Sequence, residues 1–410
     1  MTDDLVSVED HRDRILAAID PLPAFDQPLM EAFGLSAAED VRASVALPRF
    51  DNSAMDGYAV AHVDVAQATD ASPVHLPVVG EIGAGQASLL AVSPGTAVKI
   101  MTGAPVPAGA DSVVPYEWTD RGVANVVISR APEKGQHVRP QGEDVSEGDL
   151  LVEAGTVLGA RQIGLLAAVG RPSVRSRPRP RVVVISTGSE LREPGSSLGH
   201  DSIYDGNSFL LAAAARQAGA IAYRVGIVPD EPRTFLGSLN DQLVRADLVI
   251  TSGGVSMGDY DVVKEALAPL GTVWFGGVAM QPGKPQGFGT VGEDAVPIIT
   301  LPGNPVSAYI SFEQFALPAI RRLMGRTPYV RPSADAMITH DLTSPGGRRQ
   351  LARGILSLVD GRLAITPVGA QGSHLIGDLA ESDALIVVPE SVTSVAAGET
   401  VTVLPLDEEF

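Results

Sequence analysis

Cysteine is absent from this chain of 410 residues, and its absence excludes several kinds of chemistry. Without it there can be no disulfide, no thiolate nucleophile and no cysteine-ligated metal site. Aromatic residues supply only 5% of the chain, and 30 Lys and Arg residues stand against 49 Asp and Glu. The formal net charge of −19 argues against binding nucleic acid or an anionic membrane through general electrostatics. An anionic ligand therefore needs locally placed donors or a metal ion.

Long apolar runs are missing as well. No uninterrupted stretch is long enough to span a bilayer, and the acidic opening 1–4 lacks the apolar centre of a secretory signal. Together with the lack of disulfides, this predicts a cytoplasmic protein. Hydrophobic residues still supply 45% of the chain, which is enough for large cores, and the length predicts two to four domains.

Glycine and proline divide the chain into segments of different character. The pattern of residues 7–20 predicts a helix capped by Ser7, and a second short helix is expected at 28–33. From 48 to 139, short Val and Ile runs alternate with turn residues, which is typical of a small inserted β domain. Residues 328–410 again show short strands, and we expect a small barrel or sandwich there.

Strands and helices alternate between these two β segments, which predicts a doubly wound α/β domain. The expected strands are 182–186, 223–228, 248–251, 273–275 and 296–301. The expected helices begin at Asn207, near Glu231, at Asp259 and at Pro305. Five arginines between 171 and 181 are interpreted as a solvated linker or an edge strand, with a phosphate-binding strip as the alternative. The predicted fold class is α/β plus β.

Three Gly/Pro-rich loops follow apolar runs in the α/β segment. They are Ser252-Gly253-Gly254-Val255-Ser256, Pro282-Gly283-Lys284-Pro285 and Leu301-Pro302-Gly303-Asn304-Pro305-Val306-Ser307. Loops at the carboxyl ends of parallel strands are where α/β sheets bind ligands. Glycine lets the backbone come close to a ligand, and proline keeps the loop rigid. The loops therefore predict a preformed pocket for an anionic, phosphorylated small molecule.

Two of these loops also allow a plainer interpretation. Asn304 before Pro305 is a preferred helix start, whose free amides either bind an anion or belong to a capped helix without a ligand. Lys284 does not belong to a phosphate-binding P-loop, because Pro285 follows it where Ser or Thr is required. It is either a cation for an oxyanion or an ordinary surface lysine.

Acidic residues stand at the same kind of position. Glu190, Asp230, Asp259 and Asp261 follow apolar runs, where acids often only complement a helix dipole. Beside an anionic ligand they would repel it unless they held a hard cation. Mg²⁺, bound by few carboxylates plus ligand oxygens, is the simplest solution. The seven histidines show no metal-site spacing, so zinc has little support.

Further motifs bring these loops together with the inserted β segment. They are Asp51-Asn52-Ser53-Ala54-Met55-Asp56-Gly57-Tyr58-Ala59, Met101-Thr102-Gly103-Ala104-Pro105, Gly142-Glu143-Asp144, Ser186-Thr187-Gly188-Ser189-Glu190-Leu191 and Gln371-Gly372-Ser373-His374. With the three Gly/Pro loops they occur in order along the chain. On these motifs the chain resembles the MoeA family of molybdopterin molybdenumtransferases, which includes the E domain of gephyrin. The resemblance runs essentially end to end.

The resemblance implies an architecture and a reaction. It implies an elongated domain from 1–47 and 140–178, an inserted β domain at 48–139, an α/β molybdopterin-binding domain at 179–327 and a C-terminal β-barrel at 328–410. It implies a homodimer, with each site between the α/β domain of one subunit and the inserted domain of the other. The implied reaction converts adenylyl-molybdopterin and molybdate into molybdenum cofactor and AMP. It requires Mg²⁺ and follows a molybdopterin adenylyltransferase.

Functional residues of the family are carried over position by position. The expected catalytic residues are Asp56, Thr102, Glu190, Asp230 and Asp261. The expected substrate-binding residues are Ser252, Gly253, Gly254, Lys284, Pro302, Gly303, Asn304, Pro305 and Ser373. Glu190 and Asp261 are the expected ligands of Mg²⁺. Gln281 stands where many relatives carry lysine, so one cation is missing beside the anion site.

Other functions stay open at this point. A molybdopterin adenylyltransferase shares the α/β core and the Gly-Gly loop, although the extra β domains favour molybdate insertion. A scaffold of the same fold would bind partners without molybdate-dependent activity, and a sugar-phosphate enzyme is the plainest alternative. The sequence does not distinguish molybdate from tungstate as the substrate.

Overall fold

The computed structural model describes residues 5–85, 90–253, 261–407 and 410. The chain forms two compact units, each described below by itself. One comprises residues 1–25, 155–157 and 175–410, and the other comprises 26–154 and 158–174. Across the described ranges, no helix is both long and apolar enough to cross a membrane.

The smaller unit consists mainly of short strands. Its elements are β2 (Ser36–Ala37), β3 (Val41–Arg42), β4 (Asn52–Ser53), β5 (Gly57–Val60), α2 (His62–Val65), β6 (Val74–Ile82), β7 (Ala97–Ile100), β8 (Ser112–Pro115), η1 (Tyr116–Trp118), β9 (Asn125–Ile128), β10 (Val138–Arg139), β11 (Leu150–Val152) and α3 (Ala160–Ala168). Five strands form one sheet in the order β8-β5-β7-β6-β9. Tyr58 and Val60 enter one core while Ala59 enters another, because successive side chains of a strand point to opposite faces.

The helix expected at 28–33 is wrong. The chain instead forms β1 (Phe25–Pro28) and then a turn, in which the N–H of Ala32 donates to the carbonyl of Pro28 at 3.0 Å. Gly34 follows with φ of +76°. The buried Leu29 and Ala32 sit three residues apart, which imitates a helical pattern within a single turn.

Within the arginine-rich segment, 173–177 form a paired strand, contrary to the expected edge strand, whereas 178–180 connect it to the next strand. Residues Ser173–Arg177 form β12, which is the central strand of the sheet β1-β12-β2. Val174 and Ser176 are buried and alternate with Arg175 and Arg177, so the arginines occupy one face of a paired strand.

The larger unit contains a six-stranded sheet in the order β16-β13-β17-β21-β20-β18. Its elements are α1 (Val8–Ala17), β13 (Arg181–Ser186), β14 (Leu191–Arg192), β15 (Ile203–Tyr204), α4 (Asn207–Gln217), β16 (Ile221–Arg224), α5 (Pro232–Leu243), β17 (Leu248–Ser252), α6 (Val262–Leu267), η2 (Ala268–Leu270), β18 (Val273–Gly277), β19 (Met280–Gln281), β20 (Pro285–Val291), β21 (Val296–Leu301), α7 (Pro305–Ser311), η3 (Phe312–Ala316) and α8 (Leu317–Leu323). Strands β16, β13, β17 and β21 are parallel, whereas β20 is antiparallel to both of its neighbours. The predicted α/β alternation is present, but β20 was not predicted, and β16 begins and ends earlier than the strand expected at 223–228.

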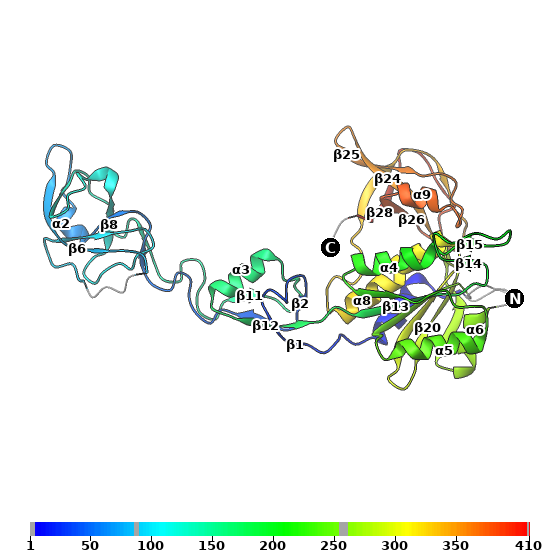
Figure 1. The fold of residues 1–410 in the computed structure, drawn as a ribbon. Helices are drawn as coiled ribbons and strands as arrows, with labels where there is room; N and C mark the ends of the chain where they lie inside the picture. Colours follow the sequence, from blue (N-terminus) through cyan, green and yellow to red (C-terminus); the bar gives the residue numbers. More distant parts are fainter. Residues whose placement is uncertain (1–4, 86–89, 254–260, 408–409) are drawn as a thin grey trace. The chain divides into compact units, whose positions relative to one another are not determined.

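Helices cover both faces of this sheet (Figure 1). Helices α4 and α8 lie on one face, and α5 and α6 lie on the other. Val182 and Val184 of β13 pack into the first core, while Val183 and Ile185 pack into the second. Helix α1 joins the first core, and Ser7 caps it by accepting the N–H of Asp10 at 3.0 Å, as expected.

The C-terminal region forms a closed β-barrel. Its elements are β22 (Ala334–Ile338), β23 (Leu342–Thr343), β24 (Arg349–Val359), β25 (Arg362–Pro367), α9 (Ile376–Glu381), β26 (Ala384–Val388), β27 (Ser394–Val395) and β28 (Thr400–Pro405). Five strands pair in the order β24-β25-β22-β28-β26, and β26 pairs back to β24, which closes the ring. The barrel expected in this region is therefore confirmed, and with it the predicted α/β plus β class.

Candidate functional site

The ends of three parallel strands lie level with one another. Ser186 at the end of β13 pairs with Ser252 at the end of β17, and Ser252 pairs with Leu301 at the end of β21. The loops that follow these strands therefore begin side by side at the carboxyl edge of the sheet. This is the edge at which α/β sheets bind ligands.

A cavity of about 240 Å³ lies among these loops. Five of the residues expected in the site line it, and they are Glu190, Ser252, Gly253, Gly303 and Pro305. The strands β14 and β15 form part of its wall, with Ile376 at the start of α9. Ile203, Tyr204 and Ile376 are 57%, 46% and 46% exposed, so the cavity combines polar loops with accessible apolar side chains.

Asn207 connects two of the loops. Its side-chain Nδ2 donates to Ser252 Oγ at 2.8 Å and to the carbonyl oxygen of Gly303 at 2.7 Å. The sequence suggests that Asn207 caps a helix, but it is the first helical residue of α4, and the preceding Gly206 occupies the cap position without a side-chain bond. The side-chain amide of Asn207 thus joins two loops and does not cap its own helix, although the sequence had predicted that it would.

Glycine is required where these loops approach each other. Gly253 has φ of +89°, and a Cβ added there would lie 2.7 Å from the carbonyl oxygen of Thr187. A Cβ added at Gly303 would lie 3.5 Å from the Cα of Gly253. The backbones of the loops therefore come together with no room for a side chain at Gly253.

The loop after β13 is held by two acidic residues. Ser189 and Asp230 bond reciprocally, with the N–H of Ser189 donating to Asp230 Oδ2 at 2.8 Å and the N–H of Asp230 donating to Ser189 Oγ at 3.3 Å. Asp205 is 1% exposed and accepts from Ser186 Oγ at 3.2 Å and from the N–H of Ser208 at 3.0 Å. Asp230 thus positions the loop that carries Glu190, and Asp205 anchors its start.

Asn304 and Ser373 meet across two segments of the chain. Asn304 Nδ2 donates to Ser373 Oγ at 2.9 Å, and the N–H of Val306 donates to the carbonyl of Ser373 at 3.1 Å. Asn304 has the backbone position of a helix cap, but its side chain makes no capping bond. Pro302 is buried at the base of the same loop.

The loop between β18 and β20 lies at the same edge of the sheet. Its Lys284 is half-buried, and the carbonyl of Lys284 accepts the N–H of Val278 at 2.7 Å. Lys284 is not among the residues that line the cavity. Arg348 Nη1 lies 3.5 Å from Gln281 Oε1, so a guanidinium stands beside the position where the resemblance implies a missing cation.

The remaining expected acid lies at the start of α6. Asp261 is 4% exposed, and its Oδ1 accepts the N–H of Lys264 at 3.4 Å. Gly254 and Asp259 lie outside the described residues. Among the residues that are described, no group of three or more His, Asp and Glu side chains is arranged to hold a metal ion.

Asp56 and Thr102 belong to the smaller unit and contact each other. The N–H and the hydroxyl of Thr102 both donate to Asp56 Oδ1, at 2.7 and 2.8 Å. The backbone bond, followed by the hydroxyl bond, lowers the pKa of Asp56 below its usual value, since both stabilise the ionised carboxylate. The pair is exposed and presents a fixed negative charge.

Reasoning from sequence missed Asn207 and Asp205 as parts of the site. The signal available was the polar run Asp205-Gly206-Asn207-Ser208 after the apolar pair Ile203-Tyr204, which has the composition of a turn. Their bonding partners lie up to 96 positions away in the chain, so only the fold reveals them.

Three family models together match most of the chain. The MoeA N-terminal region (domain I and II) matches residues 6–170, the probable molybdopterin binding domain matches 183–322, and the MoeA C-terminal region (domain IV) matches 335–406.

Curated relatives and solved structures agree with these matches. A protein of Mycobacterium tuberculosis named molybdopterin molybdenumtransferase 2 is 45% identical over 98% of this chain and 99% of its own length. A Bacillus subtilis protein named molybdopterin molybdenumtransferase is 34% identical over 91% and 87%. A crystal structure of a MoeA protein from Pyrococcus horikoshii superimposes with a TM-score of 0.86 at 30% identity, covering 99% of this chain and 100% of that one. The chain therefore belongs to the MoeA family of molybdopterin molybdenumtransferases, which are transferases of molybdenum cofactor biosynthesis.

Proposed function

We propose that this transferase inserts molybdate into adenylyl-molybdopterin and releases AMP. The observation that carries the proposal is the preformed cavity at the carboxyl edge, where Asn207 ties the loops of Ser252 and Gly303 together. Loops held in place before a ligand arrives suit a reaction that depends on positioning.

The proposed reaction needs no covalent bond between the substrate and a protein side chain. Molybdate must exchange oxo ligands for the two dithiolene sulfurs of the pterin, and the substrate supplies those sulfurs. A chain without cysteine can therefore carry out the reaction. The loops of Ser252, Gly303 and Asn304, with Ser373 and Lys284, would bind the phosphate, the pterin and the oxyanion. The protein contributes orientation and charge compensation.

Mg²⁺ is part of the proposal, and Glu190, an exposed carboxylate on the cavity wall, is suited to hold it. Asp261 does not line this cavity, and its carboxylate is 4% exposed and caps α6, so it would have to turn away from that cap to become a second ligand. Mg²⁺ takes one or two such carboxylates and completes its coordination with water and substrate phosphates. When bound, it would polarise the adenylyl phosphate for cleavage. Asp230 would act through the loop that it holds beside Glu190.

We also propose that the enzyme works as a homodimer in the cytoplasm. Asp56 and Thr102 would then enter the cleft of the other subunit, with the carboxylate already ionised and oriented by two hydrogen bonds. A molybdopterin adenylyltransferase would supply the substrate. The division of the chain into four domains, at the boundaries given above, stays a prediction.

AMP release tests the proposed reaction. The protein is incubated with adenylyl-molybdopterin at fixed Mg²⁺, with and without molybdate, and AMP is quantified by chromatography. We expect release that depends on molybdate. Parallel samples receive molybdopterin and ATP, and consumption of ATP would instead favour an adenylyltransferase. Folded protein that releases no AMP with molybdate or with tungstate would contradict the proposal.

A further inference from the structure

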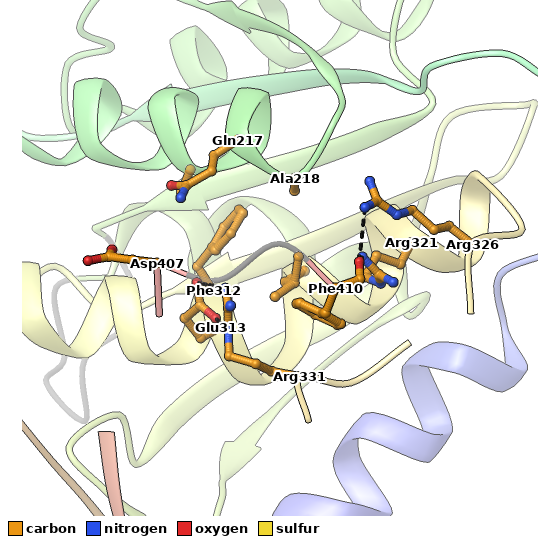
Figure 2. Close-up of a pocket in the computed structure, with 11 residues that line it drawn as sticks. Gln217, Ala218, Phe312, Glu313, Arg321, Arg326, Arg331, Asp407 and Phe410 are labelled. Atoms are coloured by element: carbon orange, nitrogen blue, oxygen red, sulfur yellow. Dashed lines mark hydrogen bonds and ion pairs between the residues drawn. The ribbon is translucent and has the colours of Figure 1, made fainter. Parts of the chain in front are cut away.

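The charged side chains of one pocket in the larger unit are already engaged by the chain itself (Figure 2). Arg321 Nη1 and Arg326 Nη2 donate to the main-chain oxygen of Phe410, at 2.6 and 2.9 Å. Arg331 forms an ion pair with Glu313 at 3.0 Å. These contacts hold segments of the larger unit together. The carboxylate of Asp56 in the smaller unit differs, because it is exposed to solvent.

Asp56 keeps one carboxylate oxygen for a ligand. Thr102 places both of its donors, the N–H and the hydroxyl, on Oδ1. In the part of the chain that the structure describes, no donor contacts Oδ2. An exposed side chain on a loop has no packing to hold it. The orientation of Asp56 therefore depends on the backbone segments that carry it and Thr102.

Ser53 joins those two segments through its backbone. Its N–H donates to the carbonyl of Ala104 at 3.0 Å, and its carbonyl accepts the N–H of Gly103 at 2.8 Å. Ser53 also pairs with Val138 of β10. The loop that carries Thr102 is therefore fastened to β4, the strand that leads to Asp56.

The hydroxyl of Ser53 shapes the turn between β4 and Asp56. Ser53 is fully buried, and its Oγ donates to the carbonyl of Met55 at 2.5 Å and accepts the N–H of Met55 at 3.3 Å. A serine hydroxyl that bonds the backbone two residues further on replaces a backbone turn. Asp56 follows directly, and its own carbonyl accepts the N–H of Tyr116 at 3.1 Å. The chain therefore enters and leaves Asp56 in a fixed direction.

A second buried serine of the same unit has a different setting. Ser112 is also fully buried, and its Oγ donates to Asp111 Oδ1 and to the carbonyl of Glu133, at 3.1 and 3.3 Å. It pairs with Val60, at the end of β5 away from Gly57. Ser112 thus stabilises the unit at a distance from the segments of Asp56 and Thr102, which makes it a matched control.

We propose that Ser53 is a positioning residue of the transferase reaction, which orients Asp56 and Thr102 before the substrate arrives. It fixes the turn that presents Asp56 and holds the loop that brings the donors of Thr102 to it. This role rests on the proposed function, in which Asp56 takes part in the reaction. A group that is already in place needs no reorganisation when the substrate reacts.

The pKa of Asp56 tests the positioning without any assay of activity. An NMR titration of the aspartate carboxyls follows it, and Asp56→Asn identifies the signal by its loss. In Ser53→Ala we expect the pKa of Asp56 to rise towards its usual value, because the donors of Thr102 no longer stay within reach. Ser112→Ala should lower the Tm as well but leave that pKa unchanged. An unchanged pKa of Asp56 in folded Ser53→Ala would overturn the inference.

Ser53→Cys covers the case in which Ser53→Ala does not fold. A thiol is a weaker donor and acceptor than a hydroxyl, so we expect the same rise in the pKa of Asp56 to a smaller extent. No rise in Ser53→Cys would overturn the inference equally.

AMP release measures the consequence for the reaction. We expect Ser53→Ala to lower kcat/KM about tenfold or more, and Ser112→Ala to keep the wild-type value at temperatures at which it is folded. In an Asp56→Asn background, Ser53→Ala should cause little further loss, because a positioning residue acts through the residue that it holds. Full activity of Ser53→Ala beside an inactive Asp56→Asn would refute the positioning role. Full activity of both variants would instead refute the part of Asp56 in the proposed reaction and would overturn the inference with it.

Discussion

Replacing Gly253 with alanine tests how the loops of the cavity are built. The new Cβ would lie 2.7 Å from the carbonyl oxygen of Thr187 and 3.2 Å from its hydroxyl, so backbone has to move. The φ of +89° adds the strain of a conformation that side chains rarely adopt, about 1–3 kcal/mol. Movement of Thr187 also weakens its N–H bond to the carbonyl of Ser252, worth about 1 kcal/mol. The variant should lose about 2–4 kcal/mol of unfolding free energy.

The matched control is Gly237→Ala within α5. A Cβ at Gly237 meets no atom within 4 Å, and a glycine inside a helix is worse than alanine by roughly 0.5–1 kcal/mol. Gly237→Ala should therefore stabilise, whereas Gly253→Ala destabilises. Urea unfolding followed by circular dichroism measures both, and AMP release should fall about tenfold or more only in Gly253→Ala. A Gly253→Ala protein with wild-type stability and activity would refute the close approach of the loops.

Three further substitutions test other parts of the structure. Asn207→Ala removes both hydrogen bonds between the loops and should lower the free energy of unfolding by about 1–3 kcal/mol. It should also reduce the rate of AMP release. The control Asn240→Ala, on the exposed side of α5, should change neither quantity. His11 is fully buried against Trp274 and Phe315, and burial lowers its pKa from 6.5 to about 4. Above pH 6.5 the imidazole of His11 is neutral in the folded and in the unfolded chain, and the protein keeps its full stability. As the pH falls towards 4, the unfolded chain takes up the proton first, so the free energy of unfolding decreases by about 3 kcal/mol in total. Urea unfolding between pH 4 and 7 measures how the free energy of unfolding depends on pH. We expect the decrease towards pH 4 in wild type and in the control His340→Phe, where the histidine is exposed, but not in His11→Phe. The same pH dependence in all three proteins would exclude His11 as the cause. Thr102→Val removes one of two donors to Asp56 and should raise the pKa of that carboxyl towards its usual value in an NMR titration, and an unchanged pKa would show that the hydroxyl bond has no effect.

Strand and helix order could be read from the sequence where apolar runs are long. The run of β13 has four successive buried Val and Ile residues, and its sheet packs on both faces, which is the pattern that predicts a buried strand. Strand β20 lacks that pattern, because Pro285, Gly287 and Gly289 interrupt it. Those glycines are needed there: a Cβ at Gly287 would meet Thr300 and Phe275, and one at Gly289 would meet the backbone of Thr272. The close packing of neighbouring strands therefore requires glycines that lower the strand propensity of β20, which is why the sequence pattern did not predict it.

The residues of the site also differ in whether their positions could be predicted from the sequence. Glu190, Ser252 and Gly303 could be placed near each other in advance, because each lies at the end of a strand of one sheet or just beyond it. Asn207 could not, since Asn beside a helix start usually caps that helix. Its actual bonds depend on the spacing of β17 and β21, which only the folded sheet sets.

Formation of active cofactor is the measurement that tests the central claim most directly. The reaction product is added to a molybdoenzyme prepared without its cofactor, and the recovered activity is measured against the molybdate concentration. We expect recovery that requires this protein, adenylyl-molybdopterin and molybdate together, and that falls about tenfold or more with Asn207→Ala. AMP release without any recovered activity, or full recovery with Asn207→Ala, would contradict the proposal that this cavity carries out molybdate insertion.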